Sequence, residues 1–101
     1  MHHTKHFDNC MKAFGKGYGP VHKWLDEYAG LTYPEMAHRC VRHHLAGVEE
    51  VRFMWGDGAA EAALLHIKDD LEWAGYNRNK VPYDCYEAEN YWGSIFDFIN
   101  K

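Results

Sequence analysis

The sequence lacks the features that mark membrane-spanning, secreted and disulfide-rich proteins. No stretch approaches the roughly 18 consecutive apolar residues of a membrane span, and the first ten residues have no apolar core of signal-peptide length. The three cysteines, Cys10, Cys40 and Cys85, are widely separated and form no CxxC pair, so neither a disulfide framework nor a zinc knuckle is indicated. We therefore expect a cytoplasmic protein that makes no contact with membranes.

An excess of positive charge is also missing. Eleven lysines and arginines stand against fifteen acidic residues, which gives a formal net charge of -4. Nonspecific binding to the phosphate backbone of a nucleic acid requires the opposite balance, so this function is disfavoured. The GxGxxG, GxSxG, P-loop and HExxH motifs are absent as well, so none of the enzyme classes that they mark is indicated.

Histidines and aromatic residues are the types that stand out. The chain has 101 residues, the size of one domain, and hydrophobic residues make up 47% of it, as in ordinary globular proteins. Aromatic residues reach 16%, and we expect most tryptophans and tyrosines to lie in the core. There are eight histidines, whose full protonation would change the net charge from -4 to +4. The composition therefore points to histidine chemistry.

Glycine and proline divide the chain into helical segments. Periodic apolar residues and helix-start signals between these breaks predict an all-α fold, a single-domain bundle of four or five helices over residues 1–101. The tail at 94–99 fits a strand or a helical turn equally well. The expected helices cover residues 6–14, 22–28, 33–55, 58–74 and 82–92.

Two histidine–aspartate pairs have the same spacing. His22 and Asp26 are four residues apart, as are His66 and Asp70, so each pair lies on one face of its helix. His44 falls within the apolar stripe of the long 33–55 helix. Imidazole and carboxylate groups from facing helices commonly hold Zn, Fe, Mn or Ni. The predicted metal ligands are His22, Asp26, His44, His66 and Asp70.

Further polar residues surround these ligands in the sequence. We expect His38 and His43 to lie beside the metal ligands and support them, and Arg39 and Arg42 to bind an anion such as phosphate. The combination suggests a metal-dependent phosphohydrolase-like site. The competing interpretation is structural: each histidine pairs with a nearby carboxylate, and the arginines pair with acidic side chains or water.

Three segments resemble a family of small uncharacterised bacterial and phage proteins, a domain of unknown function. The family pattern has IHxWxD, RHRAxRHHxxG and HxREDLG segments in this order, and residues 20–26, 37–48 and 66–71 are similar to them. Ala37 replaces an arginine of the pattern, and Glu72 replaces a glycine. The resemblance carries over these positions: His22, Trp24, Asp26, His38, Arg39, Arg42, His43, His44, Gly47, His66 and Asp70.

The resemblance implies a bacterial or phage origin and leaves a second function open. Short acidic phage proteins commonly bind and block a component of the host. The alternative to a metal-dependent enzyme is therefore a non-enzymatic inhibitor, which would bind a host defence protein or a small phosphorylated ligand such as a signalling nucleotide. The sequence predicts neither the oligomeric state nor the identity of such a partner.

Overall fold

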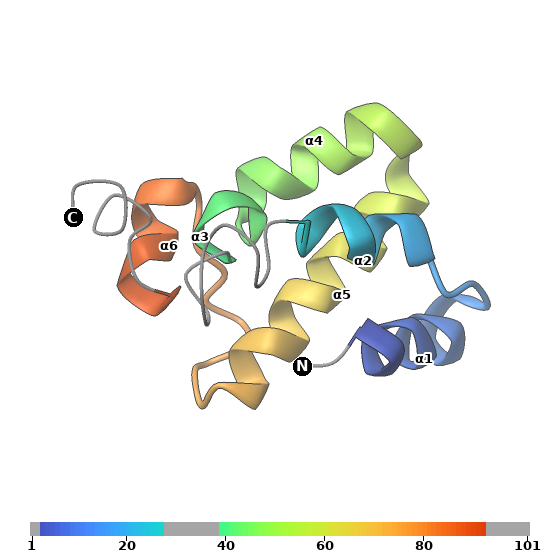
Figure 1. The fold of residues 1–101 in the computed structure, drawn as a ribbon, viewed down its shortest axis with the longest axis horizontal. Coiled ribbons are helices and arrows are strands. Elements are labelled where there is room, and N and C mark those ends of the chain that lie inside the picture. Colours follow the sequence, from blue (N-terminus) through green and yellow to red (C-terminus); the bar gives the residue numbers. More distant parts are fainter. Residues whose placement is uncertain (1–2, 28–38, 93–101) are drawn as a thin grey trace.

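The computed structural model describes residues 3–27 and 39–92, and its regular secondary structure there is entirely helical (Figure 1). This confirms the predicted all-α class. No helix within these two ranges is long and apolar enough to cross a membrane. The helices are α1 (His3–Phe14), α2 (Gly19–Leu25), α3 (Arg39–Arg42), α4 (Leu45–Trp55), α5 (Asp57–Trp73) and α6 (Cys85–Trp92).

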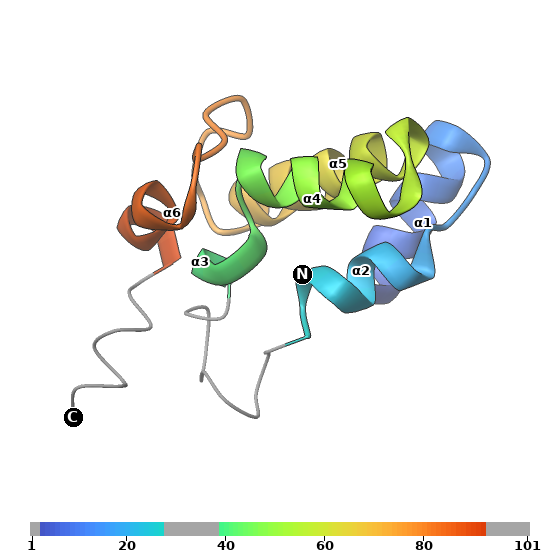
Figure 2. The ribbon, with the colours of Figure 1, turned by 90° about the horizontal axis from the view of Figure 1, so that it is seen from above.

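Helix α5 forms the centre of the fold. Only Gly56 separates it from α4, and the positive φ of 94° at this glycine lets the chain reverse between the two helices. The two helices therefore lie side by side (Figures 1 and 2). Helices α1 and α2 contact one part of this pair, and α3 and α6 pack against each other at its other end.

The buried side chains of α5 explain this arrangement. Its first half buries four alanines, and three of them, Ala59, Ala60 and Ala63, lie in one core cluster with Val48 and Val51 of α4, which their small side chains let pack closely. Its second half buries Ile67 and Leu71 in the same core. The alanine-rich segment is the helix that the sequence predicted, and it ends at Trp73, just before the glycine expected to stop it.

The prediction of one unbroken helix through residues 33–55 is wrong. The chain leaves the helical conformation at His43 and His44, between α3 and α4, and His44 has an extended backbone with φ −157°. The ring of His44 stabilises this break, because its Nδ1 accepts from the Gly47 amide at 2.9 Å and its Nε2 donates to the Val41 carbonyl at 2.8 Å. Residues 33–38 and the tail at 94–99 lie outside the described part of the chain.

The expectation of an aromatic core holds only in part. Trp92 is buried and Trp24 is half-buried against the core. Trp55 and Trp73, in contrast, are 46% and 62% exposed. The core is made mainly of alanines and branched aliphatic residues, and several aromatic side chains are left on the surface.

Candidate metal centre

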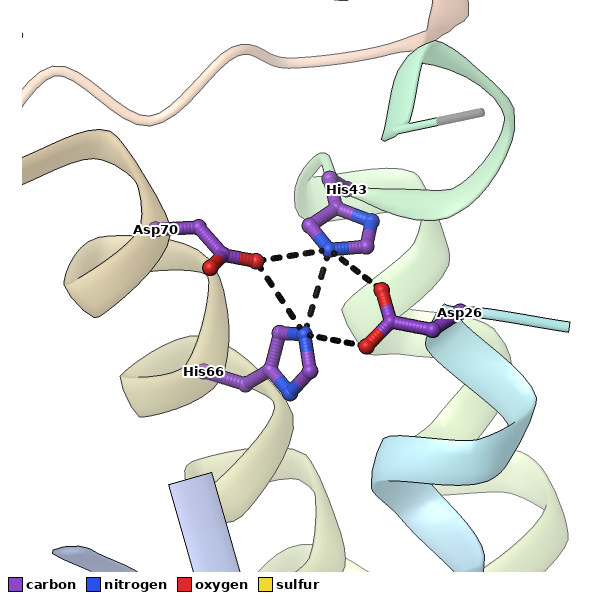
Figure 3. Close-up of side chains that lie close together, drawn as sticks. All are labelled: Asp26, His43, His66 and Asp70. Atoms are coloured by element: carbon purple, nitrogen blue, oxygen red, sulfur yellow. Dashed lines mark hydrogen bonds and ion pairs between the residues drawn. The ribbon is translucent and has the colours of Figure 1, made fainter. Parts of the chain in front are cut away.

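Four side chains from three parts of the chain point toward one another (Figure 3). Asp26 directly follows α2, His43 lies at the junction of α3 and α4, and His66 and Asp70 are one turn apart on α5. One nitrogen of each histidine and one oxygen of each carboxylate all lie within 4.8 Å of one another. We call these four residues the His/Asp cluster.

The contacts within the His/Asp cluster are short and converge on two nitrogens. Nε2 of His43 lies 3.1 Å from Nε2 of His66, 3.0 Å from Asp70 Oδ2 and 3.3 Å from Asp26 Oδ1. Nε2 of His66 lies 3.2 Å from Asp70 Oδ2 and 3.5 Å from Asp26 Oδ2. The Nε2 atom of each histidine thus has the other ring and both carboxylates as close neighbours.

The His/Asp cluster is buried on all sides except one. His43, His66 and Asp70 are fully buried, whereas the side chain of Asp26 is 24% exposed. Any exchange of ions with solvent would therefore take place on the side of Asp26.

Two more side chains bind Oδ1 of Asp70, the carboxylate oxygen that His43 and His66 do not contact. His6 of α1 donates from Nε2 to Oδ1 at 3.0 Å, and Arg39 of α3 donates from Nη2 to the same oxygen at 3.2 Å. Burial alone would raise the pKa of Asp70, but hydrogen bonds from His43, His6 and His66 hold it well below its usual range. Asp70 is therefore a carboxylate with both oxygens occupied, Oδ1 by His6 and Arg39 and Oδ2 by His43 and His66.

A chain of hydrogen bonds leads away from the His/Asp cluster on the side of His66. Nδ1 of His66 lies 2.8 Å from Nδ1 of His22, and Nε2 of His22 donates to the Gly17 carbonyl at 2.8 Å. The ring of His6 stacks on that of His66, with 3.6 Å between centroids and 15° between planes. The ring of His66 is thus fixed at one face and at both nitrogens.

The buried histidines have pKa values shifted in both directions. Burial lowers the pKa of His22 to about 4 and also lowers that of His6, in both cases with help from the nearby ring of His66. Burial opposes charge on His66 too, but hydrogen bonds to Asp26 and Asp70 and their charges outweigh it, so its pKa is raised. The acidic side chains therefore concentrate positive charge at His66.

The structure describes eight of the nine predicted site residues, and their surroundings differ. It brings Asp26, His66 and Asp70 together with His43, which was expected to support the ligands. His22 contacts His66 from behind, and His44 is occupied as the cap of α4. His38 lies outside the described residues.

Both predicted anion-binding arginines are paired with carboxylates. Arg39 contacts Asp70 and lies over the ring of Trp92, 4.8 Å from its centroid. Arg42 donates to Glu27 and to the Trp24 carbonyl, and its guanidinium lies 4.1 Å from the centre of the Trp24 ring. A phosphate would therefore have to compete with Asp70 for Arg39 and with Glu27 for Arg42.

The sequence reasoning missed His6 and misjudged His43. His6 and Cys10 are four residues apart on α1 and are both fully buried, so they mark an inward helix face that a search for histidines on buried faces would have found. His43 directly follows α3, and its amide still donates to the Arg39 carbonyl at 2.9 Å, so the end of this helix carries its ring to the centre.

One comparison with known proteins gives a result. Residues 1–74 match the family described as Domain of unknown function (DUF6915). The chain belongs to this family. No curated protein and no solved structure shows significant similarity to it. The matched region of the DUF6915 family contains the whole His/Asp cluster, as well as His6, His22 and Arg39.

Proposed function

We propose that this protein binds one divalent transition metal ion, of the group Zn, Fe, Mn and Ni, through Asp26, His43, His66 and Asp70. The observation that carries the proposal is the crowding of two imidazole nitrogens and two carboxylates around one centre. Imidazole nitrogen and carboxylate oxygen are the donors that these ions share.

The spacing of the donors supports a single ion. Ligands at about 2.0 to 2.2 Å from a tetrahedral ion lie about 3.3 to 3.6 Å from one another. Five contacts within the His/Asp cluster measure 3.0 to 3.5 Å, and the two to Asp26 involve one carboxylate oxygen each. The four side chains thus have nearly the separation that coordination of one ion requires.

The number of hydrogens available within the His/Asp cluster gives a second argument for a bound cation. An imidazole nitrogen carries at most one hydrogen, so Nε2 of His43 and Nε2 of His66 together supply at most two hydrogens to the five close contacts. The other contacts bring lone pairs together, which is unfavourable in a buried site. A cation at the centre would turn all of these contacts into favourable ones.

Phosphoester hydrolysis receives less support than metal binding. A hydrolase of that kind needs an accessible cationic side chain to hold the phosphate, but Arg42 is engaged by Glu27, and Arg39 is buried and contacts Asp70 through Nη2. Hydrolysis therefore remains a prediction. Turnover of a phosphomonoester or phosphodiester that depends on both added metal and Asp26 would add it to the function.

The test compares two neighbouring variants of untagged, full-length protein. Asp26→Asn replaces the cluster carboxylate on the exposed side with an amide, a weaker ligand, and Glu27→Gln removes the same charge one residue away, outside the His/Asp cluster. Metal content is measured by mass spectrometry, and affinity by titration with Zn²⁺ and Co²⁺. We expect about one ion per chain, retained by Glu27→Gln and weakened at least tenfold by Asp26→Asn. The proposal is wrong if no ion binds, or if both variants bind as tightly as the parent.

An exposed apolar surface on α4 favours a second candidate function, binding to another protein. Phe53 is 93% exposed, and a shallow hollow beside it is lined by Trp24, Ala46, Glu49, Glu50, Phe53 and Met54. Exposed apolar patches bordered by charge are typical of interaction sites. The two glutamates favour a partner helix with an apolar face and lysine or arginine at its border.

Helical peptides of matched apolar content test this second candidate. Peptides with basic borders should bind and those with acidic borders should not, as measured by fluorescence anisotropy. Phe53→Ser should abolish binding, whereas Tyr86→Ser, which removes another exposed ring on α6 outside the hollow, should leave binding intact. Equal binding of both peptide sets, or none, would contradict it, and sedimentation of the protein alone would show whether a second copy covers the patch instead.

A further inference from the structure

We infer that His22 is a positioning residue, which fixes the hydrogen of His66 on Nδ1 and so directs the Nε2 lone pair of His66 to the centre of the His/Asp cluster. The inference rests on the proposed metal site. It goes beyond that proposal because it gives His22, predicted from sequence as a ligand, a different task.

The direction of the hydrogen bonds follows from the Gly17 carbonyl. A carbonyl oxygen can only accept, so Nε2 of His22 must carry the hydrogen in its 2.8 Å contact with Gly17. A neutral His22 ring then has a bare Nδ1, which accepts from Nδ1 of His66 at 2.8 Å. With its hydrogen on Nδ1, a neutral His66 has its lone pair on Nε2, the atom that faces His43 and both carboxylates.

A charged His22 ring would reverse this order, and its surroundings oppose that state. The ring is 2% exposed and lies against the rings of His6 and His66, with centroid distances of 5.6 and 5.1 Å.

The turn before α2 carries the Gly17 carbonyl. A Cβ at Gly17 would lie 2.0 to 2.3 Å from ring carbons of Phe7, so a larger residue there would have to displace this ring, which is 43% exposed. Tyr18 then adopts a left-handed conformation with φ 57°, and α2 begins at Gly19. The glycine-rich segment thus supplies the carbonyl that orients the ring of His22 toward His66.

Partners of this kind orient metal-bound histidines and strengthen their donor nitrogen, and their loss typically weakens metal affinity about 10- to 100-fold. We expect a loss of that size in His22→Leu, which keeps the volume but removes both nitrogens. His22→Asn places an amide oxygen near the position of Nδ1 and should restore part of the affinity. Val51→Ala, a core substitution outside this chain of contacts, should lower stability without weakening metal binding.

Nitrogen NMR of the uniformly ¹⁵N-labelled, metal-free protein tests the hydrogen-bond order without any ion. We expect the Nδ1 shift of His22 in the range of an unprotonated nitrogen, and a scalar coupling to Nδ1 of His66 across the shared hydrogen. A hydrogen on Nδ1 of His22 would overturn the inference even if metal binds. If no metal binds but the coupling is found, the hydrogen-bond order stands, while the proposed function and the metal-positioning role fail together.

Cobalt spectra of the loaded variants complete the test. Saturated His22→Leu should have the same visible absorption bands as the parent, because His22 supplies no ligand. A changed spectrum would show that His22 coordinates the ion itself and would overturn the positioning role. Unchanged affinity in His22→Leu would overturn it as well.

Discussion

His43 and His44 are consecutive in the chain, but their rings take part in different structures. The ring of His43 enters the His/Asp cluster, 3.0 Å from Asp70, whereas the ring of His44 binds the backbone at Val41 and Gly47. The extended backbone of His44 separates them. One break in the helix thus supplies a candidate ligand and a helix cap together.

Substitution of these two histidines should therefore have different effects. His44→Ala removes the cap of α4, so we expect the free energy of unfolding to fall by about 1 kcal/mol, with metal affinity nearly unchanged. His43→Ala removes a donor and should weaken metal binding strongly. Urea unfolding with chelator and metal titration measure the two effects, and loss of metal binding in His44→Ala alone would contradict this assignment.

Asp70 should be the most sensitive acidic residue of the chain. Asp70→Ala leaves the buried guanidinium of Arg39 without its carboxylate, and breaking a buried pair in this way typically costs about 3 to 5 kcal/mol. Its neighbour Asp69, which pairs with Asn9 and Arg78 nearer the surface, is the matched control, and Asp69→Ala should cost clearly less. Similar losses in urea unfolding would show that the Asp70 pairings contribute little.

Gly47→Ala should disturb the junction that carries His43. A Cβ at Gly47 would lie 2.1 Å from the Arg42 carbonyl oxygen, so the backbone between α3 and α4 must shift. We expect a loss of about 1 to 3 kcal/mol, as for other overpacked sites, together with weaker metal binding. Gly19→Ala is the control, since its Cβ meets nothing within 4 Å, and it should change neither property.

The stability of the metal-free protein should peak near pH 6.5. His22, with a pKa of about 4, and His44, whose pKa burial also lowers, are neutral when folded. Their contribution is complete above an unfolded pKa of about 6.5 and is lost as the pH falls below it. The raised pKa of His66 acts in the opposite sense: its contribution is complete below about 6.5 and is lost as the pH rises through its folded pKa.

Urea unfolding between pH 4.5 and 8.5 measures both slopes. Zn²⁺ should abolish the loss on the alkaline side, because the ion then occupies the nitrogen that otherwise holds the proton of His66. His44→Asn should reduce the acid slope only. A stability that rises steadily on acidification would contradict the lowered pKa values.

Much of the fold followed from local patterns in the sequence. The alanine-rich segment and the glycine after it predicted α5, and the four-residue spacing placed His66 and Asp70 on one face of that helix. These features depend on residues within a few positions of one another. The helical periodicity of the sequence is therefore sufficient to predict such features.

The break at residues 43 and 44 could not be found in the same way. Periodicity continues across it, because Cys40, His44, Val48 and Val51 have helical spacing. The break arises because the ring of His44 bonds to the backbone locally, while Leu45 and Ala46 donate to the carbonyls of Pro82 and Tyr83, far away in sequence. Tertiary hydrogen bonds thus override the helical pattern.

The His/Asp cluster also bears on the order of events in folding. Its residues come from α2, the α3–α4 junction and α5, and the contact between His22 and His66 spans 44 residues of chain. A bound ion would act as a cross-link that forms only after these helices have docked. Metal should therefore slow unfolding more than it speeds folding, as expected for an interaction made after the transition state.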